Sequence, residues 1–350
     1  MTETNPLLSV RNLHTQFHTA EGIVHAVDGV DFDVERGETV CIVGESGSGK
    51  TVTIESITRI LPMPPGEITE GEVIFDGEDL LSLSDDEIRQ YRGSRISHVF
   101  QNPQGSLNPV YTVGAQIREA IHASLDVSKQ EAKERAIELL DEVGIPEAAS
   151  RINDYPHEFS GGMQQRVIIA IALAGEPDLL IADEPTTALD VTIEAQILRL
   201  FKQIQEERDM SIIFVTHDLG VVAEIADRVV VMYASKVMEQ ADVYELFDTP
   251  AHPYTRALLD CLPGQGPVTP IRGSLPSLIA PPEGCRFADR CEYAIEPCRR
   301  GEQPEMVPAS DDDHRVSCIL YEEGFDESII YSGDGMTADS IARVNSGDTT

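Results

Sequence analysis

One eight-residue segment, GESGSGKT at residues 44–51, constrains the fold of this chain more than any other feature. It fits the phosphate-binding pattern G-x-x-x-x-G-K-[ST]. The apolar residues 40–43 before it predict a strand, and residues 52–60 after it predict the start of a helix. A strand, a glycine-rich loop and a helix in this order direct backbone N–H groups and the positive end of the helix at one anion.

The residue types in this segment predict a nucleoside triphosphate site. Lys50 would reach the β- and γ-phosphates, and Thr51 would bind Mg²⁺. The glycines allow the backbone to curl around the phosphates. We therefore expect the whole loop to bind nucleotide, through Gly44, Glu45, Ser46, Gly47, Ser48, Gly49, Lys50 and Thr51.

A second apolar run, residues 179–182, ends in Asp183 and Glu184. It predicts a buried strand whose end lies beside the phosphate loop. Asp183 would hold Mg²⁺, directly or through a water, and Glu184 could polarise the attacking water as a general base. The alternative is a strand that ends in two solvated acids.

Two further positions carry candidate chemistry. Ser160, followed by two glycines, opens a predicted helix and would expose N–H groups at its positive end, which is a second anion site. Alternatively, Ser160 only caps that helix. His217 follows a predicted strand at residues 211–215, where a lone histidine could equally be structural.

The order of apolar segments predicts an α/β fold. Residues 7–43 alternate in polarity, which favours short antiparallel strands, whereas the pattern becomes helical from about residue 105. Apolar runs then alternate with helix-like stretches such as residues 191–208, which indicates a mostly parallel sheet covered by helices. We expect a nucleotide-binding domain at 1–261 with a helical subdomain at about 105–165, an extension at 262–320, and an acidic, disordered tail at 321–350.

The charge of the chain excludes one class of partner. The net charge is −35, so nucleic acid binding is disfavoured because phosphate backbones attract basic surfaces. We interpret this charge as adaptation to molar salt, where screening allows dense surface carboxylates. An ordinarily acidic cytosolic protein is the alternative. No apolar run reaches the roughly 18 residues that a membrane span needs, and no secretory signal is visible.

The order of six motifs resembles the ATPase subunits of ABC transporters. They are the loop at 44–51, FQN at 100–102, SGGMQQR at 160–166, IADEP at 181–185, TALD at 187–190 and THD at 216–218. The resemblance covers roughly residues 7–260. It implies a P-loop NTPase with a RecA-like core, an antiparallel β subdomain and an inserted helical subdomain.

The resemblance also implies roles for individual residues. Gln101 would touch Mg²⁺ and the attacking water, and His217 would hydrogen-bond the γ-phosphate. Ser160 and Gly162 would bind the γ-phosphate of ATP held by a second ATPase subunit, and Asp190 would link the two sites. Phe17 would stack on adenine, in place of the more usual Tyr. No departure from the family pattern removes a catalytic group.

Three segments resemble the peptide-importer branch of this family: residues 101–109, 252–259 and 281–318. The branch handles oligopeptides, dipeptides, nickel and some sugars. The implied partners are an identical or related second ATPase, two transmembrane permeases and, indirectly, an extracytoplasmic solute-binding protein, which implies the cytoplasmic face of the cell membrane. A soluble ABC ATPase without a transporter is the alternative.

Four cysteines lie in the extension: Cys285, Cys291, Cys298 and Cys318. Four thiolates can hold a [4Fe–4S] cluster or a tetrahedral zinc ion. Their spacing lacks the close C-x₂-C pairs of a zinc ribbon, and the resemblance favours the iron–sulfur cluster. Zinc and unligated thiols stay open, while disulfides are disfavoured in a reducing cytosol.

Overall fold

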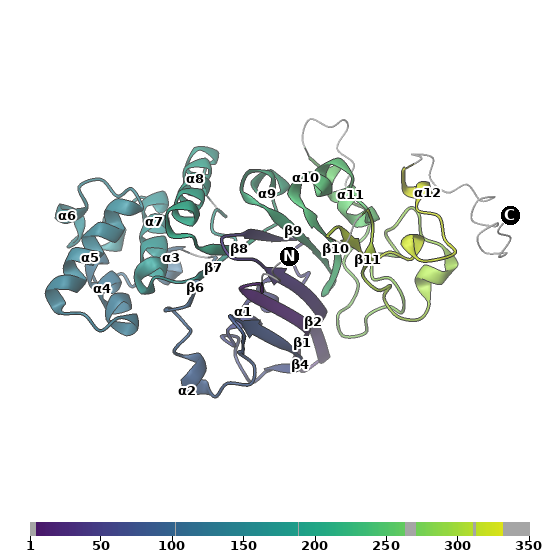
Figure 1. Cartoon of the computed structure of the whole chain (residues 1–350), viewed down its shortest axis with the longest axis horizontal. Helices are drawn as coiled ribbons and strands as arrows, with labels where there is room; N and C mark the ends of the chain where they lie inside the picture. The colour runs from purple at the N-terminus through teal and green to yellow at the C-terminus, as the bar shows by residue number, and fades with distance from the viewer. Residues whose placement is uncertain (1–4, 102, 188, 263–270, 311–312, 332–350) are drawn as a thin grey trace.

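A computed structural model describes residues 5–101, 103–187, 189–262, 271–310 and 313–331. It contains two β-sheets, a helical region at one end of the molecule and the extension at the other (Figure 1). The expected α/β fold is confirmed.

The N-terminal residues form an antiparallel sheet in the order β2-β1-β4-β5. Its strands are β1 (Leu8–Thr19), β2 (Gly22–Val34), β4 (Gly66–Phe75) and β5 (Glu78–Asp79). β1 and β2 have 12 and 13 residues, so the expectation of short strands was wrong. Register shifts near Asn12, whose φ is 45°, let these strands bend without ending.

The main sheet has the strand order β11-β12-β10-β9-β3-β8-β7-β6. The strands from β9 to β6 run parallel, whereas β10, β12 and β11 add antiparallel pairs at one edge. Its strands are β3 (Thr39–Val43), β6 (Ile96–Val99), β7 (Leu179–Asp183), β8 (Ser211–Thr216), β9 (Arg228–Tyr233), β10 (Lys236–Asp242), β11 (Val307–Pro308) and β12 (Arg315–Val316).

Both faces of the main sheet are covered, which explains its continuous apolar strands. In β3, Val40 and Ile42 pack into a core shared with the antiparallel sheet and helix α1 (Lys50–Ile57). Cys41 and Val43 point to the other face and join a core with the helical region and the extension. The phosphate loop therefore leaves a strand that is fixed from both sides.

The helical region lies beyond β6 and β7 (Figure 1). It comprises α3 (Pro103–Ser106), α4 (Val113–Ser124), α5 (Lys129–Glu142), α6 (Ala148–Arg151), η1 (Pro156–Glu158), α7 (Gly161–Ala172) and η2 (Leu173–Gly175). Its helices extend past the expected end near residue 165 because α7 continues unbroken toward the main sheet. The remaining helices are α2 (Asp85–Ile88), α8 (Val191–Arg208), α9 (Leu219–Ile225) and α10 (Val243–Asp248).

From here on we use the word extension for all of the described chain from α11 onward, which begins before the boundary expected at residue 262. It contains α11 (Pro253–Leu259), η3 (Glu296–Arg299), η4 (Ile319–Tyr321) and α12 (Ser328–Tyr331). Its strands β12 and β11 continue the main sheet beyond β10. The described chain continues to residue 331 with Ile330 fully buried, so the first part of the expected tail is packed; residues 332–350 lie outside the described ranges. Among the described helices, none has the length and apolarity that a membrane span requires.

Candidate nucleotide-binding site

The loop at residues 44–51 requires glycine at two points of close backbone approach. A Cβ on Gly44 would lie 2.0 Å from the Met232 carbonyl oxygen, and one on Gly49 would lie 2.3 Å from that of Ala26. Both residues also have positive φ values, 152° and 101°. The neighbouring strands therefore leave space only for bare backbone at these two positions. Helix α1 begins within the segment, at Lys50.

Lys50 and Thr51 occupy the positions that the motif predicts. The Lys50 ammonium curls back and donates to the carbonyl oxygens of Gly44 (2.7 Å) and Glu45 (3.0 Å). Burial lowers the pKa of Lys50, and the nearby carboxylates of Glu184 and Asp183 oppose that shift. The Thr51 hydroxyl donates to Asp183 Oδ2 at 2.9 Å, which joins the loop to the end of β7.

Glu184 is the centre of a second cluster. Its carboxylate accepts hydrogen bonds from Gln101 Nε2 (2.8 Å) and the Thr187 hydroxyl (3.0 Å), and lies 3.0 Å from His217 Nδ1. Burial acts to raise the pKa of Glu184, but the hydrogen bonds from His217 and Thr187 outweigh it, so the pKa lies below its ordinary value. Three segments far apart in sequence thus converge on one ionised carboxylate.

Several buried polar atoms around the loop lack protein partners. Among the described residues, no hydrogen-bond partner is present for Glu45 Oε1, Ser48 Oγ or Asp183 Oδ1. Burial raises the pKa of Asp183 despite the hydrogen bond from Thr51. A cation would favour the charged form of Asp183, and a hard oxygen donor beside a threonine hydroxyl suits Mg²⁺. The residues therefore fit the expected metal.

The remaining candidate residues lie outside the pocket formed by these clusters. Ser160 is exposed and caps α7, with its hydroxyl 3.4 Å from the Met163 amide nitrogen, and Asp190 caps α8. Gly162 is buried against Ile193. Phe17 is half-buried on β1 beside Gly66. None of the four lines the pocket, whose described lining residues come from other segments; Asn102 and Ala188 lie outside the described ranges.

Comparison with known proteins identifies the family. Residues 27–187 match the model of the ABC transporter family. Oligopeptide transport ATP-binding protein OppD of Bacillus subtilis is 50% identical over 326 residues, which cover 92% of this chain and 91% of the relative. The chain belongs to the ATP-binding subunits of ABC transporters. The activity of this family is ATP hydrolysis.

Further matches extend this assignment. Residues 238–298 of the ABC subunit match the model of the oligopeptide/dipeptide transporter C-terminal region. Dipeptide transport ATP-binding protein DppD of Bacillus subtilis is 49% identical over 94% of this chain and 98% of the relative. A solved dimeric ATP-binding cassette bound to ADP and Pi has a TM-score of 0.61 at 32% identity, over 67% of this chain and 98% of that one.

Some residues at this site were not predicted from the sequence. The pocket has a volume of about 600 Å³ and is lined by Gly44, Gln101, Glu184 and His217, but also by residues of and after α11: Leu258, Cys261 and Leu262. Tyr254 and Arg290 contact Glu45 of the loop. Their only sequence signal is position in the importer-like segments.

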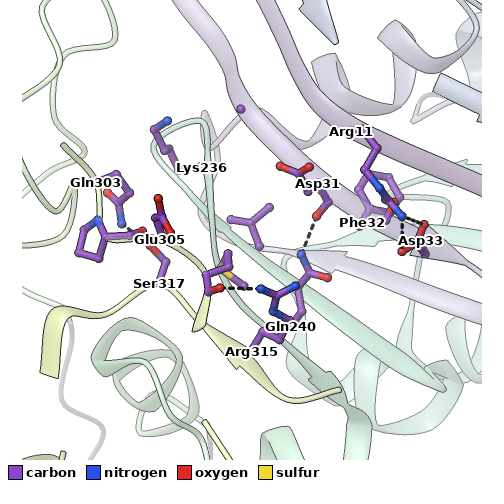
Figure 2. A pocket seen from close by; sticks show the side chains of 14 residues that line it. Arg11, Asp31, Phe32, Asp33, Lys236, Gln240, Gln303, Glu305, Arg315 and Ser317 are labelled. Carbon is purple, nitrogen blue, oxygen red and sulfur yellow. Dashed lines mark hydrogen bonds and ion pairs between the residues drawn. The ribbon is translucent and has the colours of Figure 1, made fainter. Parts of the chain in front are cut away.

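A second pocket lies where the extension joins the antiparallel sheet, and we call it the seam pocket (Figure 2). Its volume is about 480 Å³. Several of its polar side chains have partners within the pocket: Gln240 donates to the Asp31 backbone carbonyl, Arg315 to the Met306 backbone carbonyl, and Arg11 pairs with Asp33. The seam pocket is therefore a polar join between two parts of the fold.

The four cysteines of the extension lie in one neighbourhood. The Cys285 amide donates to the Cys298 carbonyl at 2.8 Å. Burial raises the pKa of Cys285 to about 11 and of Cys291 to about 12, and neighbouring thiols add to each shift. Burial also raises the pKa of Cys318, to which all three other cysteines contribute. Within the described ranges, no three His, Cys, Asp or Glu side chains form a group that could hold a metal ion, so the expected metal site gains no support from ligand geometry.

Proposed function

We propose that this ABC ATPase powers the import of oligopeptides or dipeptides. The supporting observation is the combination of an intact nucleotide site with a C-terminal region that matches the oligopeptide/dipeptide transporter model. Relatives named for oligopeptide and dipeptide transport cover nearly the whole chain. Nickel or a sugar is a related cargo that the ATPase itself would not distinguish, because it does not contact the solute.

The geometry supports a defined division of labour. Lys50 would bind the β- and γ-phosphates, while Thr51, Asp183 and Gln101 would hold Mg²⁺, which neutralises charge that develops on the phosphates. Glu184, already ionised and hydrogen-bonded, would accept the proton of the attacking water. His217, at 3.0 Å from Glu184, would orient that carboxylate and reach the γ-phosphate.

We further propose that the working unit is a head-to-tail dimer. Ser160 is exposed at the start of α7, outside the pocket of its own chain, and its motif would complete the site of a second ATPase subunit. Phe17 would stack on adenine, and Asp190 would lie between the two sites. ATP would close the dimer, hydrolysis would open it, and Gln101 would pass the motion to two permeases at the cytoplasmic face of the membrane.

Isolation of the tagged chain from gently solubilised membranes tests the transporter assignment. We expect two polytopic membrane proteins and a second ATPase to co-purify. In vesicles containing that assembly and its solute-binding protein, short peptides should stimulate ATP hydrolysis more than nickel or sugars do. Recovery only from the soluble fraction, with no membrane protein bound, would support a soluble ABC ATPase instead.

For the extension, we propose a [4Fe–4S] cluster bound by Cys285, Cys291, Cys298 and Cys318. The support is that the four thiols are largely buried and influence one another electrostatically, and that the family resemblance favours a cluster at these four positions. Four thiolates are the usual ligands of such a cluster. Anaerobically purified protein should be brown and contain equal iron and sulfide. Colourless protein with no iron would refute the cluster.

The net charge supports a proposal about the working environment. At −35, the chain carries an excess of carboxylates that repel one another at low ionic strength. Molar salt shortens the screening length to about 3 Å and removes most of that repulsion. We expect the melting temperature to fall steadily when KCl is diluted from molar to millimolar concentration. A flat profile would contradict salt adaptation.

A further inference from the structure

The first residues of the phosphate loop are held by the C-terminal extension. The Glu45 backbone N–H donates to the Tyr254 hydroxyl at 2.9 Å, across 209 positions of sequence. The Glu45 carboxylate accepts from Arg290 at 3.0 Å, across 245 positions. One loop residue is therefore bound through both its backbone and its side chain by residues outside the nucleotide-binding motifs.

Arg290 is itself held in one orientation. Its guanidinium also donates to the Tyr233 hydroxyl (3.1 Å) and to the carbonyl oxygens of Arg272 (2.8 Å) and Ile271 (3.4 Å). The side chain is only 6% exposed. A planar guanidinium with this many fixed acceptors has little freedom to move, so it can define the position of Glu45.

The contacts of Glu45 continue to the catalytic lysine. The carbonyl oxygens of Gly44 and Glu45 are the two acceptors of the Lys50 ammonium. Tyr254 binds the peptide unit that carries the Gly44 oxygen, and Arg290 holds the side chain of Glu45, the residue that carries the second oxygen. A continuous chain of hydrogen bonds thus leads from the extension, through Glu45, to the group that must reach the β- and γ-phosphates.

A second arginine supports the loop from its other side. Arg286 donates to the Ala234 carbonyl at 2.9 Å and pairs with Asp28. The next residue, Ser235, donates its N–H to the Ser48 carbonyl of the loop at 2.9 Å. Arg286 directly follows Cys285 and Arg290 directly precedes Cys291, so the segment between these two cysteines carries both contacts.

We propose that Arg290 and Tyr254 are positioning residues for MgATP, which set the affinity of the phosphate loop through Glu45. Neither touches the reacting atoms. Their loss should weaken nucleotide binding while leaving turnover at saturating ATP little changed, because Glu184 and His217 stay in place. This inference rests on ATP binding at residues 44–51 and is independent of the cargo and of what the cysteines hold.

Equilibrium binding of fluorescent MgATP to the full-length chain in molar KCl tests the proposal. Arg290→Met should raise Kd about tenfold, because it removes a charge-assisted hydrogen bond. Tyr254→Phe removes only the acceptor of the Glu45 N–H and should raise Kd about threefold. The matched control is Arg299→Met, which breaks the exposed Arg299–Asp289 pair elsewhere in the extension and should leave Kd unchanged.

Two additional variants separate positioning from charge and from general destabilisation. Arg290→Lys keeps the charge but cannot reproduce the guanidinium contacts, so its Kd for MgATP should be raised nearly as much as that of Arg290→Met. Glu45→Gln is measured both alone and together with Arg290→Met. The Kd of the double variant should equal that of Arg290→Met, since both changes break the same Arg290–Glu45 ion pair. Amides at residues 44–49 should exchange hydrogen faster in Arg290→Met than in Arg299→Met.

Three results would overturn the inference. They are wild-type Kd in Arg290→Met, wild-type Kd in Arg290→Lys, or losses in the double variant that multiply instead of coinciding. If Arg290→Met does not fold, Tyr254→Phe decides the question, and wild-type Kd in that variant counts against the proposal. A chain that binds MgATP normally but fails to import peptides would refute the proposed cargo and leave this inference intact.

Discussion

The nucleotide pocket and the seam pocket are similar in size but differ in how their polar groups are satisfied. Their volumes are about 600 and 480 Å³. Around the phosphate loop, buried oxygens of Glu45, Ser48 and Asp183 lack partners, whereas no side chain that lines the seam pocket, all of them within the described ranges, has a buried unpartnered atom. A buried polar group without a partner is costly unless a ligand completes it, so this difference favours the phosphate loop over the seam pocket as a ligand site.

The largest expected difference between the two pockets is the effect on ATP turnover of replacing one glutamate in each. Glu184→Gln removes the proposed base but keeps an acceptor for Gln101 and Thr187, so the fold should persist. We expect ATP hydrolysis at saturating ATP to fall by about 10²- to 10⁴-fold. Steady-state phosphate release by the assembled ATPase pair measures the loss, and light scattering should detect a dimer that persists with MgATP.

The matched control is Glu305→Gln, the same chemical change at an exposed residue that lines the seam pocket. Its turnover should equal that of the wild type. Full turnover in Glu184→Gln would exclude Glu184 as the base. Failure of MgATP to dimerise that variant, with its intended ATPase partner supplied, would count against the composite site.

Acid should destabilise the extension through His252, which caps the start of α11. This histidine is 1% exposed, accepts a hydrogen bond from the Tyr254 N–H, lies near the Phe287 ring, and donates its backbone N–H to Glu239. Burial lowers the pKa of His252 to about 3. A lowered histidine pKa means that protonation favours the unfolded chain, so stability is lost as pH falls from about 6.5 toward 3.

The expected loss at pH 5, relative to pH 7.5, is about 2 kcal/mol from this group alone. Urea unfolding of wild type and His252→Asn at both pH values in molar KCl isolates it from other titrating groups. Asparagine can still cap α11 but does not titrate. Equal pH dependence in the two proteins would show that His252 titrates normally in the folded state.

The catalytic side of this comparison could be predicted from sequence because its groups follow local patterns. Gly44 and His217 come directly after apolar strands and Asp183 is the last residue of one, and parallel strands bring their carboxyl ends to one edge. The same local logic predicted α8 at residues 191–208. Gln101 donates to Glu184 at 2.8 Å, so two residues that were each expected at the attacking water lie side by side.

The extension could not be predicted in the same way. Tyr254 and Arg290 reach Glu45 from 209 and 245 positions away, and nothing in their local sequence indicates what they touch. The bulged strands β1 and β2 were expected to be short because a register shift interrupts the alternation of polarity without ending a strand. Contacts that depend on how separate elements pack need the three-dimensional arrangement.

The smallest effect that we expect is a loss of stability from a substitution in the seam pocket. Gln240→Ala removes a hydrogen bond to the Asp31 carbonyl and widens the seam pocket (Figure 2). Since water can replace this bond at a partly open join, we expect a loss of about 0.5–1 kcal/mol in unfolding free energy. ATP affinity and turnover should be unchanged, because no described contact links Gln240 to the phosphate loop. A tenfold change in ATP affinity or in turnover would mean that the contact between β2 and β10 influences the nucleotide site. The seam pocket would then affect function although its buried polar atoms have partners.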